Sequence, residues 1–203
     1  MKKILFAVAL ATFSLATHAD TISGLHNTGQ GLAAGVADVN YKVTDTTGAT
    51  STPYVAANVY PIGAWMANTA ASQWLLLTTN SPNDQPQGFS VWTSTFDLSG
   101  FDAASASFSG RFSADDAALV MLNNNRIGTS AGYSSWSNFS AQAGSFVAGV
   151  NTLEFVVFNQ GGSAGLRAEF IATEVSAVPE SETYAMLLAG LGLMGFLARR
   201  RKA

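Results

Sequence analysis

The chain has 203 residues, of which 11% are charged and none is cysteine, so a disulfide framework, a thiol nucleophile and a cysteine-ligated metal site are excluded. Residues 20–177 hold four basic and eleven acidic side chains, a net charge of −7, and six of the ten basic residues lie in the two terminal segments. Without a basic footprint, nucleic acid is a poor partner. The length fits one domain with appended segments.

The first 19 residues have the three parts of a secretory signal peptide. Lys2 and Lys3 precede an apolar run over residues 4–15, and Ala19 ends a small-x-small cleavage site. We therefore predict export, with a mature chain that starts at Asp20. A buried N-terminal strand or helix is the alternative interpretation.

The central part of the chain has the pattern of short β-strands. Residues 20–35 are Gly-rich and indicate a loose lead-in, whereas residues 36–44 alternate apolar and polar side chains as a half-buried strand does. In all we count nine to ten short strands, with turn signals every 8 to 12 residues. In the strand at residues 103–112, alternation places one set of side chains on a single face: Ala104, Ala106, Phe108, Gly110 and Phe112. This predicts an all-β domain over residues 36–177, an antiparallel β-sandwich without a substantial helix.

The C-terminal segment differs in composition from the rest. Residues 184–198 are uncharged and mostly apolar, and a basic cluster follows at once: Arg199, Arg200, Arg201 and Lys202. As a helix, 15 residues would span about 22 Å, less than the ~30 Å of a hydrocarbon core, but snorkelling basic side chains lengthen the effective span. We predict one membrane helix with the basic cluster as a stop-transfer signal on the cytoplasmic side.

Residues 178–203 resemble the PEP-CTERM sorting signal of Gram-negative bacteria. The resemblance rests on Val178, Pro179 and Glu180, a short spacer, the apolar run and the basic cluster; Ser181 stands where the family usually has a second proline. It implies an exosortase as partner, transient anchoring in the inner membrane with the ectodomain outside the cytoplasm, and a mature form at the cell surface or outside the cell. It also implies association with exopolysaccharide or biofilm. A permanently anchored single-span surface protein is the alternative.

Residues 115–160 resemble galactose-binding-like jelly-roll domains. Gly149, Asn151 and Leu153 match the G-x-N-x-L element that precedes a Val-rich strand, and three asparagines, residues 123–125, replace the usual Asn-Gly turn. The resemblance implies a jelly-roll fold and leaves the function open, because one fold carries many functions.

Three aromatic residues are candidates for glycan contacts. A sugar ring stacks on an exposed aromatic ring with amides or carboxylates beside it, and Tyr133 and Trp136 lie in a Gly/Ser-rich loop, with Trp65 as a third candidate. Packing of such a loop against the rim of the domain is an equally good interpretation. Trp74 and Trp92 lie within predicted strands, and we expect them in the core.

Asp115 and Asp116 form an acidic pair that could cap a turn or bind a structural Ca²⁺ through oxygen, and we expect the turn role. Catalysis has little support. The only histidine after the signal peptide is His26, and no zinc-protease, serine-hydrolase or phosphate-loop motif occurs. A glycosidase with paired carboxylates stays open, because such pairs form in space.

The sequence thus predicts an exported, non-enzymatic protein of the cell surface or extracellular matrix, sorted and cleaved by an exosortase and needing no cofactor. A carbohydrate-binding module with a defined glycan ligand is the main alternative.

Overall fold

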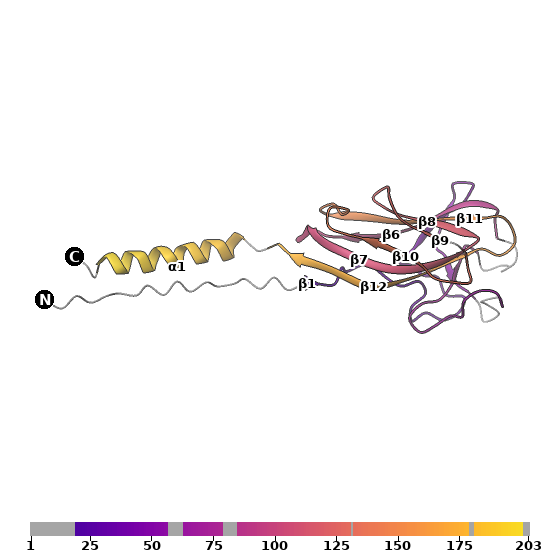
Figure 1. The fold of residues 1–203 in the computed structure, drawn as a ribbon, viewed down its shortest axis with the longest axis horizontal. Helices are drawn as coiled ribbons and strands as arrows, with labels where there is room; N and C mark the ends of the chain where they lie inside the picture. The colour runs from indigo at the N-terminus through magenta and orange to yellow at the C-terminus, as the bar shows by residue number, and fades with distance from the viewer. Residues whose placement is uncertain (1–18, 57–62, 79–84, 131, 179–180, 201–203) are drawn as a thin grey trace.

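The computed structural model describes residues 19–56, 63–78, 85–130, 132–178 and 181–200 (Figure 1). The predicted signal peptide, apart from Ala19, lies outside these residues. The described part is an all-β domain followed by one helix, as the sequence predicts.

Every strand of the domain pairs in the antiparallel sense. The strands are β1 (Ala19–Asp20), β2 (Lys42–Thr44), β3 (Thr50–Ser51), β4 (Tyr54–Val55), β5 (Leu75–Leu76), β6 (Gly88–Asp97), β7 (Phe101–Asp115), β8 (Ala117–Leu122), β9 (Asn125–Ser130), β10 (Ser137–Ala141), β11 (Val150–Asn159) and β12 (Gly165–Ala177). Their order is β3-β2-β6-β11-β8-β9-β10-β7-β12-β5-β4, and β1 pairs with β12.

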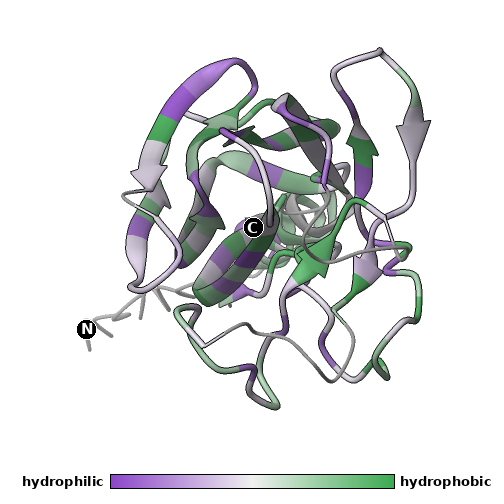
Figure 2. Cartoon of the chain, turned by 90° about the vertical axis from the view of Figure 1, so that its right-hand side faces the viewer, coloured by the Kyte–Doolittle hydropathy of each residue, from purple (hydrophilic) through white to green (hydrophobic). Residues whose placement is uncertain are grey.

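The sheet is one continuous curled sheet, which corrects the prediction of two separate sheets. One half runs from β3 to β9 and the other from β10 to β4, and a single residue pair, Phe139 with Gly128, joins β10 to β9. The sheet bends around its interior, so the halves face each other across a core (Figure 2). Phe155 on β11 and Phe112 on β7 meet there with ring centroids 5.8 Å apart.

Two glycines let the sheet curl at this junction. A Cβ on Gly128 would lie 2.8 Å from the Cβ of Phe139, and one on Gly110 would lie 2.3 Å from the Cζ of the same ring. Larger side chains at either position would push the Phe139 ring out of the core, so the close approach requires glycine. Phe108 and Phe112, on either side of Gly110, are buried as the alternation predicts.

The Gly-rich lead-in is part of the domain and not loose. Ile22 is buried in the core, and Thr28 is fully buried beside β12. The Thr28 backbone N–H donates to the Ala168 carbonyl at 3.1 Å, and its hydroxyl accepts from the Ala168 N–H at 3.0 Å. Residues 20–35 therefore cover an edge of β12 that would otherwise lack partners.

The helix α1 (Ser181–Arg200) begins and ends close to the predicted bounds of the apolar segment. Its side chains from residue 185 onward are exposed and do not pack on the domain. Within the described residues, no helix combines the length and apolarity that a membrane crossing requires, so the predicted membrane helix is not confirmed. The physical reason is composition: polar Ser181 and Glu182 and basic Arg199 and Arg200 occupy the two ends, and only the stretch between them is apolar.

Candidate functional site

An additional layer covers the outer face of β7 and β12, the face opposite the core. Trp65 and Trp74 come from the segment that forms this layer, with ring centroids 4.3 Å apart, and they join Ala56 and Leu76 in a second small core. Trp65 is only 5% exposed, so the prediction that it contacts a glycan is wrong. The sequence around an aromatic residue in a loop does not show which residues its ring packs against. In the structure, the Trp65 ring packs against Trp74. Trp74 and Trp92 are buried, as expected.

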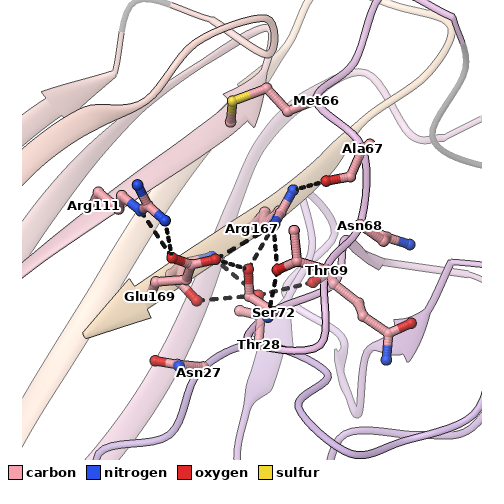
Figure 3. A network of polar contacts seen from close by, with 12 residues as sticks. Asn27, Thr28, Met66, Ala67, Asn68, Thr69, Ser72, Arg111, Arg167 and Glu169 are labelled. Carbon is pink, nitrogen blue, oxygen red and sulfur yellow. Dashed lines mark hydrogen bonds and ion pairs between the residues drawn. The ribbon is translucent and has the colours of Figure 1, made fainter. Parts of the chain in front are cut away.

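A polar network lies under this layer, centred on Glu169 of β12 (Figure 3). Its carboxylate accepts from the Ser72 hydroxyl at 2.6 Å and from Arg111 Nε at 2.8 Å, and it pairs with Arg167 Nη2 at 3.3 Å. Burial would raise the pKa of Glu169, but the hydrogen bonds from Ser72 and Arg111 and the charges of both arginines outweigh burial and leave that pKa below its ordinary value. Glu169 is therefore a charged partner held in place.

Arg167 is the most deeply buried charge of the network, with a side chain only 2% exposed. Its guanidinium donates to the Ser72 hydroxyl at 2.6 Å, to the Thr69 hydroxyl at 3.0 Å and to the Ala67 carbonyl. Burial lowers the pKa of Arg167, and the charge of Glu169 opposes that effect. These contacts bind the covering layer to β12, so the network is primarily structural.

Trp136 packs on the exposed side of this network. The Arg111 Cζ lies 4.5 Å from the centroid of its ring and the Arg167 Cζ 4.8 Å, distances typical of cation–π contacts. Trp136 stays half-buried, and the side chain of Arg111 is 40% exposed. Asn138 on β10 is exposed and lies opposite Arg111 in the strand register. An aromatic ring, an amide and a cation thus share one surface.

Tyr133, the other predicted loop contact, is half-buried and packs against the second small core rather than beside Trp136 in the network.

Sequence reasoning missed Arg111, Arg167 and Glu169. A usable signal was present: all three lie in period-two strands at positions that alternate with core residues, so they share the outer face of neighbouring strands.

Both carboxylates of the acidic pair, Asp115 and Asp116, accept hydrogen bonds from other residues of the protein. Asp115 is buried and its Oδ2 accepts from the Trp65 indole N–H at 2.7 Å, while the Asp116 Oδ2 accepts from the Gln160 backbone N–H at 2.7 Å. Across the described residues, no third His, Cys, Asp or Glu joins them in a group that could hold a metal ion. Asp115 ends β7 and Asp116 lies between β7 and β8, and each carboxylate accepts a hydrogen bond from a segment more than 40 residues away in the chain.

The predicted sorting residues lie after β12. Val178 is 51% exposed, and its N–H donates to the Gly100 carbonyl at 3.1 Å. Pro179, Glu180, Arg201 and Lys202 lie outside the described residues. Arg199 and Arg200 end α1 and are exposed.

Comparison with known proteins identifies the C-terminal segment: residues 177–202 match the family model "PEP-CTERM protein-sorting motif". The chain thus carries this sorting motif, as predicted. No curated protein matches the chain.

Two solved structures are similar to parts of the domain. A PA14 sugar-binding domain from an RTX adhesin is 19% identical, over 47% of this chain and 58% of that one, with a TM-score of 0.28. A family 35 carbohydrate-binding module from an environmental isolate is 17% identical, over 51% of this chain and 85% of that one, with a TM-score of 0.26. These TM-scores are too low to establish a common fold.

Proposed function

We propose that this protein is an exosortase substrate: an exported, non-enzymatic protein whose β-domain is delivered to the cell surface or the extracellular matrix. The observation that carries the proposal is the match of residues 177–202 to the PEP-CTERM sorting motif, directly after the last strand of the domain. An association with exopolysaccharide or biofilm belongs to the same proposal.

The arrangement of the two ends supports this proposal. Ala19 pairs with Ser176 and Asp20 with Val175, so the expected signal-cleavage site lies beside the strand that leads into the sorting motif. The two targeting segments therefore join the domain at one end. The folded domain extends away from both (Figure 1), and Val178, which comes directly after β12, is 51% exposed.

The test is processing in a host that supplies its exosortase. Wild type should lose its C-terminal segment, and the Pro179→Ala/Glu180→Ala variant should keep it, because the pair restricts the backbone and supplies the charge next to the apolar run. Intact mass and the membrane-associated fraction of the purified protein report the outcome. Glu182→Ala, an acid outside the Val-Pro-Glu triplet, is the matched control. Trimming of the double variant at the wild-type rate would contradict the proposal.

Ser181→Pro extends the same test in the opposite direction. It restores the second proline that the family usually has, and we expect processing at least as fast as in wild type. Slower processing would show that this chain is recognised differently.

Glycan binding is a second candidate function for the domain. Trp136, Arg111 and Asn138 favour it, because stacking on an aromatic ring with hydrogen bonds from neighbouring polar groups is the way in which proteins hold a pyranose ring. Trp136 is the ring of this site, and its contacts with the two guanidinium groups hold it in one orientation before a ligand arrives.

A glycan array and calorimetry on the full chain test this function. Trp136→Ala should abolish binding, and Asn138→Ala, which leaves the stacked ring intact, should weaken it. Phe89→Ala removes another exposed aromatic ring, 61% exposed on the other half of the sheet, and should leave binding unchanged. Equal losses in the Phe89 and Trp136 variants would indicate nonspecific contact with apolar surface.

A further inference from the structure

Two cavities on the outer side of the sheet share one residue, Ile171. One has a volume of 480 Å³ and lies between the lead-in and β12. The other, of 350 Å³, lies over β7, β9 and β10. Ile171 lines both and is 65% exposed, because β12 has a bulge between Phe170 and Ala172 that places this extra residue outside the ladder. The cavities therefore meet at an exposed apolar side chain.

The smaller cavity presents hydroxyl and amide groups. Ser140 on β10 lies opposite Ser109 on β7 in the register, and Asn138 stands two residues before Ser140 on the same face. Asn138 also lies next to the Trp136 surface. This cavity thus continues the proposed glycan site along β10 towards the bulge.

The larger cavity presents similar chemistry on the far side of Ile171. Asn27 and Gln30 line it from the lead-in, and Thr173 and Glu174 line it from β12. The Asn27 Oδ1 accepts from the Phe170 N–H at 2.7 Å, which holds this amide beside the bulge. The lead-in, which the sequence suggested to be loose, is therefore one wall of the cavity.

The charges of the lining select against an anionic ligand. Glu174 is the one ionisable side chain among the described residues that line the two cavities, and no lysine or arginine lines either. The surrounding domain, residues 20–177, has a net charge of −7. The cation of the adjoining Trp136 surface, Arg111, is already paired with Glu169. The described lining therefore offers a polyanion no unpaired cation, whereas an uncharged, hydroxyl-rich chain meets hydrogen-bonding groups on both sides of an apolar contact.

We infer that the two cavities form one trough that binds an internal stretch of an uncharged linear polysaccharide, with Ile171 under the apolar face of a sugar ring at its middle. This inference rests on the proposed glycan binding. Each cavity has the size of a small-molecule site, so one sugar cannot fill the trough and several consecutive units are needed. The protein would accordingly bind sugar units within the polysaccharide chain and not the units at its ends.

The experiment measures how affinity depends on the length of the sugar. Calorimetry on the full chain would use uncharged linear glucan, mannan and galactan oligosaccharides of two, four and six units. For the sugar that binds, affinity should rise about tenfold or more from two units to six, because added units reach past Ile171 into the second cavity. Ile171→Asn should weaken binding of the six-unit sugar about tenfold, as expected for the loss of one apolar contact. Gln30→Lys, which places a long side chain in the far cavity, should act in the same way.

A matched control replaces another exposed β-branched residue elsewhere. Val39 is 76% exposed and lines neither cavity, so Val39→Asn should leave binding unchanged. Because Ile171 is exposed, its variant should melt within a few degrees of wild type; an effect on binding then reports the trough and not unfolding.

Three results would overturn the inference, and they separate it from the glycan proposal. If affinity does not depend on length and Ile171→Asn has no effect, while Trp136→Ala still abolishes binding, the trough is wrong and glycan binding stands. A preference for a uronate-containing oligosaccharide over its uncharged counterpart would contradict the assigned ligand class. If wild type binds no oligosaccharide, both proposals fail.

Discussion

The indole nitrogen of Trp65 donates a 2.7 Å hydrogen bond to the Oδ2 of Asp115, a residue 50 positions away in the chain. The bond connects the covering layer to the end of β7. Burial raises the pKa of Asp115 to about 7; the Trp65 hydrogen bond opposes this rise, and the neighbouring Asp116 adds to it. The folded protein therefore binds a proton at Asp115 over a pH range in which an unfolded aspartate would be ionised.

Asp115→Asn should flatten part of the pH dependence of stability. Because the folded pKa is raised, the stabilising contribution of protonated Asp115 is complete below about pH 4 and is lost as the pH rises through about 7. Asparagine has no such titration and keeps an oxygen that can accept from Trp65. Between pH 4 and pH 8, the melting temperature of the variant should rise relative to that of wild type as the pH increases. Parallel curves would contradict the raised pKa.

Arg167→Met should destabilise the fold by about 3 kcal/mol, at the lower end of the range for broken buried ion pairs, because Arg111 still pairs with Glu169. The loss arises from the unpartnered groups of the covering layer, among them the Ala67 carbonyl. Urea unfolding measures the change. Arg126→Met is the control: Arg126 is exposed and in no ion pair within the described part of the chain, so the expected change is about 0.5 kcal/mol or less.

Gly110→Ala should destabilise the domain by about 1–3 kcal/mol through overpacking. Its Cβ would lie 2.3 Å from the Phe139 ring and 2.6 Å from the Glu169 carbonyl oxygen. That oxygen belongs to the backbone of β12, so it cannot move away without distorting the strand. Gly63→Ala adds the same atom where nothing lies within 4 Å, and it should be nearly neutral. Similar melting temperatures for the two variants would show that the sheet can relax at Gly110.

Thr28→Val tests whether the lead-in is part of the folded unit. The substitution keeps the shape but removes the hydroxyl that accepts from the Ala168 N–H at 3.0 Å and donates to the Gln73 carbonyl at 2.8 Å. Leaving these buried groups without a partner should cost about 1–3 kcal/mol. The control, Thr129→Val, changes an exposed residue of β9. A stability loss no larger than that of the control would contradict the idea that the Thr28 hydroxyl fixes the lead-in to β12.

Period-two patterning was the reliable guide to the fold. It placed Phe108 and Phe112 in the core and predicted an all-β domain, because side-chain alternation is a local property of a strand. Curling of one continuous sheet could not be read in this way. It depends on the fit of the Phe139 ring against Gly110 and Gly128, which lie on two other strands.

The candidate site was predictable only in part. Trp136 was recognised from its loop, yet the arginines that hold it are far away in sequence and meet it through strand pairing. Trp65 resembled Trp136 in sequence, because both are aromatic residues in predicted loops. Trp65 is buried because it belongs to the second small core, and no local sequence pattern predicts that core. The sorting segment was the easiest part to recognise, because its motif is contiguous in sequence.

The pairing of β12 with β7 has a mechanical consequence. The two strands pair from Gly165 with Asp115 to Ala177 with Phe101, with register shifts between Phe170 and Ala172 and between Glu174 and Ser176, and the chain continues from the end of β12 into residues 177–202. Tension that enters through this end pulls along the axis of β12, so its hydrogen bonds with β7 are sheared together and not peeled apart one by one. The short β1 pairing beside Val175 would yield first and leave the core closed. If the domain is tethered by its C-terminus in flowing water, the pairing of β12 with β7, its longest strand pair, would thus resist the force that unfolds it.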